Sequence, residues 1–175
     1  MGLPHLRRPR YFFKDMGLEI ERKWLPFGEA YKKMIRDTKA YSIEQGYLCT
    51  DPVIRVRKEN DSFYLTYKGT GMMVREEYDL PLTKDAYDSL ILKCEGRVIR
   101  KKRYRLSIKD GLTLEIDEFL GDLDPLVLFE IEFPDKECAE KYKAPDYFGK
   151  DVTADARYTN AYLSSAGIDV NEILC

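Results

Sequence analysis

Charged side chains recur at every second position in several short segments of the chain. The first segment carries Glu19, Glu21 and Lys23. Five more segments share this spacing: Arg55/Arg57, Arg75/Glu77/Asp79, Lys101/Arg103, Glu115/Asp117 and Glu130/Glu132. Side chains two residues apart in a β-strand lie on the same face of the sheet. Because like charges on one face repel unless an opposite charge lies between them, we expect these faces to meet inside a barrel.

The residue types in these segments suit a metal and a phosphate together. Paired carboxylates without His or Cys partners are oxygen ligands of the kind that Mg²⁺ or Mn²⁺ prefers. Arg and Lys bind phosphate oxygens, and Arg can bind two at once. With Lys68 added from a neighbouring segment, seven basic side chains face eight acidic ones. One or two divalent cations would make this interior positive, which fits a polyanionic phosphate chain.

A solvated outer face is the more common explanation for any single strand of this kind, since antiparallel sheets often have one wet face. Six such strands, several of them carrying one sign of charge, favour inward-facing charges instead. The opposite faces, such as Ile20 with Trp24 or Leu114 with Ile116, are apolar. They would then point outward and need cover from helices, which we expect over residues 27–40 and 84–95.

The composition excludes several classes of protein. The 175 residues are 44% hydrophobic, and 29 basic against 31 acidic residues give a net charge of -2. This balance argues against a general binder of nucleic acid or of membrane surfaces. With one histidine, His5, and four cysteines in no CxxC pair, a zinc site is not expected. Without a secretory signal or a long apolar run, we expect a cytoplasmic protein with reduced thiols.

Alternating patterns predict about eight strands, typical of an antiparallel barrel or sandwich. The predicted strands are residues 18–25, 41–50, 53–58, 63–68, 73–80, 98–108, 112–119 and 127–133. Further helices are predicted over residues 135–143 and 154–166. We expect one domain over residues 17–175, with a natural start at Met16. The basic residues 1–16 are then an extension or a cloning-derived segment, or alternatively an arm that contacts a partner.

The ordered set of motifs resembles the CYTH superfamily, also called the triphosphate tunnel metalloenzymes. The motifs are Glu-x-Glu-x-Lys at residue 19, Arg-x-Arg at 55, Arg-x-Glu-x-Asp at 75, Lys-x-Arg at 101 and Glu-x-Glu at 130. Residues 45–48 and 151–160 are similar to short bacterial members, and the likeness runs over residues 18–163. The resemblance implies an α+β, mainly β fold: an eight-stranded antiparallel closed β-barrel, or tunnel, with helices packed outside and a C-terminal helix near one end.

The resemblance also implies roles for residues at matching positions. The metal would be held by Glu19, Glu21, Glu115, Asp117, Glu130 and Glu132. The triphosphate would be bound by Lys23, Arg55, Arg57, Lys68, Arg75, Lys101, Arg103 and Arg157. The catalytic set would be Glu21, Lys23, Glu77 and Glu132, with Glu77 orienting a water. Arg157 and the last helix could close one tunnel end, and Asp79 stands where family members often have Glu.

The resemblance favours hydrolysis of inorganic tripolyphosphate to pyrophosphate and phosphate, with Mg²⁺ or Mn²⁺ as cofactor. Alternatives are a class IV type adenylate cyclase, a nucleoside or thiamine triphosphatase, and a non-catalytic polyphosphate binder. Pure anion binding would gain nothing from so many carboxylates. The expected partner is a small-molecule triphosphate, with no nucleic acid and no membrane, and a homodimer is a candidate assembly.

Overall fold

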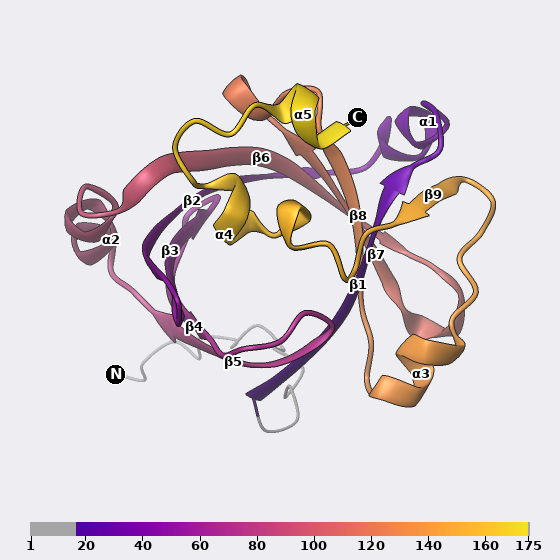
Figure 1. Cartoon of the computed structure of the whole chain (residues 1–175), viewed down its shortest axis with the longest axis horizontal. Coiled ribbons are helices and arrows are strands. Elements are labelled where there is room, and N and C mark those ends of the chain that lie inside the picture. Colours follow the sequence, from indigo (N-terminus) through magenta and orange to yellow (C-terminus); the bar gives the residue numbers. More distant parts are fainter. Residues whose placement is uncertain (1–16, 175) are drawn as a thin grey trace, which may run out of the picture.

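A computed structural model describes residues 17–174, and the predicted extension over residues 1–16 lies outside them. The strands are β1 (Leu18–Pro26), β2 (Ala40–Thr50), β3 (Val53–Glu59), β4 (Ser62–Lys68), β5 (Val74–Pro81), β6 (Glu95–Ser107), β7 (Thr113–Phe119), β8 (Val127–Glu132) and β9 (Phe148–Asp151). They form one sheet in the order β5-β4-β3-β2-β6-β7-β8-β1-β9. Because β5 also pairs with β1, strands β1 to β8 close into a ring (Figure 1). The predicted eight-stranded antiparallel barrel is confirmed, and β9 is an extra strand on β1.

Two tight turns show how the sequence sets the strand register. Asn60, between β3 and β4, has a φ of 50°. Asp110 and Gly111, in the short 3-10 turn η2 (Lys109–Gly111) between β6 and β7, have φ of 62° and 70°. Asn, Asp and Gly adopt positive φ more readily than other residues, so they favour hairpin turns. Both turns join neighbouring antiparallel strands, β3 to β4 and β6 to β7.

The two helices predicted to cover the barrel are shorter than expected. Helix α2 (Lys84–Ile91) begins at Thr83, whose side chain accepts a hydrogen bond of 3.2 Å from the Ala86 amide. It ends before residue 95 because Glu95 already starts β6. Helix α1 spans only Tyr31–Ile35 instead of residues 27–40. Gly28, with a φ of 63°, turns the chain ahead of that helix.

The C-terminal part also differs from its prediction. Instead of one helix over residues 154–166, the chain forms a 3-10 turn η4 (Ala156–Tyr158) and a helix α4 (Asn160–Leu163). Thr159 separates them in an extended conformation, and its hydroxyl accepts a hydrogen bond from the Tyr162 amide at 3.2 Å. A further helix, α5 (Val170–Leu174), follows. Helix α3 (Lys136–Lys141) lies where one was predicted, capped by Asp135.

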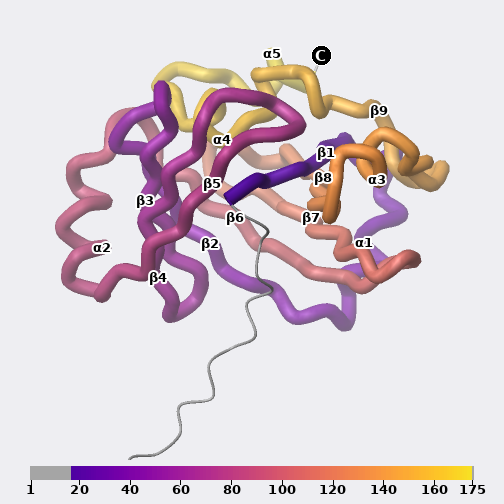
Figure 2. The backbone as a smooth tube through the Cα atoms, turned by 90° about the horizontal axis from the view of Figure 1, so that it is seen from below, coloured from indigo at the N-terminus to yellow at the C-terminus, as the bar shows by residue number. Residues whose placement is uncertain are grey.

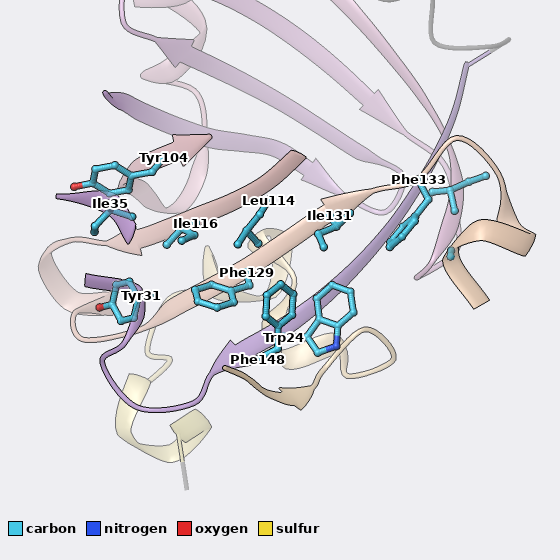
Figure 3. Packing of buried hydrophobic residues seen from close by; sticks show 12 residues of the cluster. Trp24, Tyr31, Ile35, Tyr104, Leu114, Ile116, Phe129, Ile131, Phe133 and Phe148 are labelled. Carbon is cyan, nitrogen blue, oxygen red and sulfur yellow. The ribbon is translucent and has the colours of Figure 1, made fainter. Parts of the chain in front are cut away.

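An apolar cluster on the outside of the barrel, here named the outer core, covers β1, β7 and β8 (Figure 3). Phe129 is fully buried at its centre, with its ring centroid 5.0 Å from Phe148 and 6.0 Å from Tyr31. Trp24 packs edge-on against Phe148 at 5.1 Å. Helix α1, helix α3 and the segment around β9 supply the covering side chains. The charged faces of these strands are consequently turned to the opposite side, into the barrel.

A second apolar cluster, here named the end cluster, closes one end of the barrel. Inward-facing Ile99, Phe119 and Leu128 pack there against Tyr158 and Leu163 of the C-terminal segment. Figures 1 and 2 show α4 and its flanking turns lying across that end. The C-terminal segment therefore occupies the position that the sequence predicted for it. Within residues 17–174, no helix is long and apolar enough to cross a membrane.

The outer core predicts a large cost for truncating Phe129. Phe129→Ala should lower the free energy of unfolding by about 3–5 kcal/mol, because the lost ring leaves a cavity that the neighbouring strands cannot fill. Urea unfolding followed by Trp24 fluorescence measures the change. Leu92→Ala is the control, since Leu92 is 86% exposed. Equal unfolding midpoints for the two variants would contradict this account of the core.

Candidate active site

The barrel interior buries a dense set of charged side chains. Those with an exposed fraction below one tenth are Glu19, Glu21, Lys23, Arg55, Lys68, Glu77, Lys101, Arg103, Asp117 and Glu130. Arg57, Arg75 and Glu115, from the same strand faces, are half-buried. Most of the predicted site residues are thus gathered in one place. Because burying an unpaired charge is costly, the partners of each charge determine what the site can bind.

Glu19 is the centre of the first group of ion pairs. Its carboxylate accepts hydrogen bonds from Lys68 at 2.8 Å and from Arg75 at 2.8 Å. Arg75 also reaches Glu21 at 3.1 Å, and Lys68 lies 3.1 Å from Glu77. Lys68 on β4 contacts Glu19 on β1 although β5 lies between these strands in the sheet. Such a contact requires both side chains to point into the barrel.

Arg103 is the centre of the second group. Its guanidinium donates two hydrogen bonds of 2.6 Å to Asp117, and it also pairs with Glu115 and Glu130. Lys101 pairs with the same carboxylate of Asp117. Burial lowers the pKa of Lys101 to about 8, despite the opposing effect of Asp117. Burial also lowers the pKa of Lys68, so both of these interior ammonium groups lose their protons more readily than a lysine in water.

Lys23 joins the two groups. Its ammonium lies 2.9 Å from Glu21 and 2.5 Å from Glu130, so one cation bridges carboxylates on β1 and β8. Burial acts to lower the pKa of Lys23, but Glu130 and Glu21 together raise it above its usual value. Burial likewise opposes ionisation of Glu130, and Lys23 with Arg103 holds its pKa well below the usual range. Both groups are charged at neutral pH.

Arg55 and Arg57, two residues apart on β3, are the interior cations that carboxylates neutralise least. Arg55 lies 3.8 Å from Glu77 and donates to the Thr66 hydroxyl at 2.9 Å. Its buried Nε has no hydrogen-bond partner among residues 17–174. Arg57 donates from Nε and Nη2 to the neutral side chain of Gln45, at 3.2 and 3.1 Å. Burial, followed by Arg55 and Arg103, lowers the pKa of Arg57. This part of the interior attracts an anion.

Three predicted residues lie outside this buried network. Glu132 and Asp79 are exposed at the ends of their strands, although Glu132 is directly opposite the buried Glu21. Asp79 accepts a hydrogen bond of 2.6 Å from Thr66. Arg157 has a side chain that is 46% exposed and pairs with Asp155 at 2.7 Å. The structure does not bring Arg157 to the interior cations, so its role in binding substrate stays a prediction.

The carboxylates offer oxygen donors only, which is the donor set that hard divalent cations prefer. Glu21 and Glu132 are direct cross-strand partners, and two like charges at that spacing gain from a cation between them. Across residues 17–174, however, no three acidic, His or Cys side chains converge as a ready cation site. Lysines and arginines hold Glu19, Asp117 and Glu130 instead. The donor chemistry fits a divalent cation, provided that some of these carboxylates leave their ion pairs.

Three polar residues of the interior were missed from sequence. Thr66 is fully buried and connects Arg55 to Asp79 through its hydroxyl. Gln45 is fully buried and contacts Arg57. Asn160 of α4 lies 3.4 Å from the Lys101 ammonium. Thr66 stands two residues before Lys68, so the period of two could have revealed it. A search for charged residues alone passes over all three.

Comparison with known proteins gives the same family as the motifs. The CYTH domain model matches residues 17–158. An inorganic triphosphatase of Acetivibrio thermocellus is 42% identical over 153 residues, which cover 85% of this chain and 94% of that protein. An inorganic triphosphatase of Nitrosomonas europaea is 36% identical and covers 83% of this chain and 96% of that protein.

Solved structures agree with this match. The crystal structure of an inorganic triphosphatase superposes with a TM-score of 0.61 at 33% identity, covering 86% of this chain and 96% of that chain. A Hippeastrum protein described as an adenylyl cyclase with dominant triphosphatase activity has a TM-score of 0.54 at 16% identity, a likeness that shows the fold alone. The motifs, the closed barrel and the similarity over most of the chain agree, and the chain belongs to the CYTH superfamily, the triphosphate tunnel metalloenzymes.

Proposed function

We propose that this chain is an inorganic triphosphatase, which hydrolyses tripolyphosphate to pyrophosphate and phosphate. The observation that carries the proposal is the state of Arg55 and Arg57. Two neighbouring guanidinium groups, a buried one with an unmet Nε donor and a half-buried one facing a neutral amide, favour anionic oxygen acceptors. A linear triphosphate supplies several such oxygens at once. Both relatives described above are inorganic triphosphatases.

In this proposal the interior cations hold the phosphate chain. Arg55 and Arg57 bind it first because they lose the fewest carboxylate contacts. The other interior cations exchange part of their carboxylate contacts for phosphate oxygens; they are Lys23, Lys68, Arg75, Lys101 and Arg103. Glu77 is buried next to Lys68 and Arg55. Its carboxylate can therefore accept a hydrogen bond from an attacking water beside the bound phosphate. Positioning and charge neutralisation are the main requirements of phosphoryl transfer.

Triphosphate tunnel metalloenzymes are metal-dependent, and we propose Mg²⁺ or Mn²⁺ for this chain. Glu21 and Glu132 are the first candidates to hold the cation, because they are cross-strand partners of like charge. Glu19, Glu115, Asp117 and Glu130 could join them once phosphate has taken over their basic partners. When bound, the cation neutralises phosphate oxygens in the transition state.

We propose a small-molecule triphosphate as the partner, not nucleic acid or membrane, because the cations are concentrated inside the barrel. The free thiols of Cys49, Cys94 and Cys138 support a reducing compartment, the cytoplasm. Homodimer formation remains an expectation from the size of the barrel. No contact in residues 17–174 favours the adenylate cyclase, the nucleoside or thiamine triphosphatase or the non-catalytic binder over tripolyphosphate hydrolysis.

A phosphate-release screen tests the activity. Tripolyphosphate, ATP, thiamine triphosphate and pyrophosphate would each be offered with Mg²⁺, with Mn²⁺ and with EDTA. We expect the highest kcat/KM for tripolyphosphate with one of the two cations and no turnover in EDTA. Formation of cyclic AMP and pyrophosphate from ATP, without phosphate release from tripolyphosphate, would instead identify a cyclase.

Removing one carboxylate should stop turnover. Glu21→Gln and Glu132→Gln keep the shape of the side chain but weaken cation binding, and each should lower kcat by more than about a hundredfold. Activity measured over a range of Mn²⁺ concentrations should show the need for more cation. Glu76→Gln, at an exposed position on β5, is the control. Near wild-type rates in either site variant would remove that carboxylate from the metal site.

Removing a phosphate ligand should mainly weaken binding. Arg57→Ala should raise KM for tripolyphosphate at least about tenfold, which corresponds to about 1.4 kcal/mol of binding free energy. The matched control is Arg100→Ala, because the Arg100 side chain is 63% exposed outside the barrel. An unchanged KM and kcat for Arg57→Ala would place Arg57 outside the substrate site.

A further inference from the structure

Gln45 of β2 is a neutral side chain buried within a network of charges, and it is fully enclosed. Its Oε1 accepts two hydrogen bonds from Arg57, and its Nε2 donates to the Tyr47 hydroxyl at 3.0 Å. We propose that Gln45 is a positioning residue, which aims the Arg57 guanidinium at the phosphate chain while leaving its positive charge available. This inference rests on the proposed function, because it requires a triphosphate bound at Arg57.

The hydrogen bonds allow only one orientation of the Gln45 amide. Arginine can only donate, so the amide oxygen must face Arg57. The amide nitrogen then faces Tyr47, whose hydroxyl oxygen accepts. Burial raises the pKa of Tyr47, so this phenol stays protonated at neutral pH although Arg55 and Arg57 oppose the shift. The Tyr47 proton is directed away from Gln45, and the order of donors and acceptors is fixed.

Tyr47 connects this arrangement to a rigid part of the protein. Its ring is buried in the end cluster, among side chains of the barrel wall and the C-terminal segment. Gln45 and Arg57 are also direct cross-strand partners on β2 and β3. The guanidinium is therefore held from the packed, closed end of the barrel, and no carboxylate within residues 17–174 forms an ion pair with it. A bound anion would meet a preset geometry, which reduces the entropy lost on binding.

The neutrality of Gln45 distinguishes Arg57 from its neighbours. Arg75 and Arg103 are oriented by carboxylates, which also neutralise them. A carboxylate at position 45 would orient Arg57 equally well, but it would compete with phosphate for the guanidinium. An amide keeps the orientation without that competition, because an ion pair buried at low dielectric is much stronger than a neutral hydrogen bond. Orientation and charge are thus separated at Arg57, in contrast to Arg75 and Arg103.

The test compares Gln45→Glu, Gln45→Met and Tyr47→Phe with the wild-type chain. Calorimetry with tripolyphosphate in EDTA measures binding without turnover, and thermal unfolding measures stability. For Gln45→Glu we expect at least about tenfold weaker binding but no loss of stability, because the new ion pair replaces the old contact. Ser42→Glu adds the same charge at an exposed position of β2 and should bind as the wild type does.

A double-mutant cycle separates positioning from simple packing. Gln45→Met should weaken binding and raise KM in the wild-type chain. It should change neither in an Arg57→Ala background, because the guanidinium that Gln45 positions is absent there. Tyr47→Phe should act in the same direction and lose its effect in a Gln45→Met background. Full additivity in the first cycle, or binding by Gln45→Met within about twofold of wild type, would overturn the inference.

The two proposals can fail separately. A wild-type chain that binds tripolyphosphate but releases no phosphate would refute the hydrolase, while the binding cycle would still support or overturn the role of Gln45. A chain that hydrolyses tripolyphosphate with unchanged KM in Gln45→Met and Gln45→Glu would keep the hydrolase and overturn the positioning role. A wild-type chain that neither binds tripolyphosphate in EDTA nor hydrolyses it with Mg²⁺ or Mn²⁺ would overturn both.

Discussion

The structure depends on the mutual neutralisation of charges inside a closed barrel. The Lys23 ammonium pairs with both Glu21 on β1 and Glu130 on β8. The Glu19 carboxylate accepts hydrogen bonds from Lys68 on β4 and Arg75 on β5. Removing one partner from a buried ion pair typically costs about 3–5 kcal/mol, because the other charge is left uncompensated. The strands that carry these residues therefore have to close in one register, which the pairing of β1 with β5 completes.

A barrel filled with charge cannot obtain its stability from its own interior, and the apolar side chains are arranged accordingly. The outer core lies behind β1, β7 and β8, and the end cluster closes one end. This placement leaves the middle of the barrel polar and excludes water from one side. Ion pairs within it are consequently stronger than they would be at a surface. The same low dielectric makes any incompletely paired cation, such as Arg57, a strong attraction for anions.

The sequence predicted those features that follow from a period of two. Glu19, Arg55, Lys101 and Asp117 could be assigned to one inward face because alternation fixes the face of every residue in a strand. Pairings between strands could not be predicted, since they depend on register and barrel closure. The lengths of these helices were overestimated, because the spacing of apolar residues does not show that Gly28 or Thr159 interrupts the helical conformation. Gln45 and Thr66 were missed because neutral side chains give no charge pattern.

The least neutralised arginines and the unassembled metal site have a common explanation. In the described structure, carboxylates that could bind a cation are held by lysines and arginines, while Arg55 has an unmet Nε donor and Arg57 faces a neutral amide. Phosphate oxygens that engage the basic side chains would draw them from Glu19, Asp117 and Glu130, and the released carboxylates would then be free for a divalent cation. Binding of triphosphate and metal would thus favour each other by the same amount in both directions, as linkage requires. Before that exchange, the ion pairs inside the barrel would keep both sets of ligand side chains buried and charged.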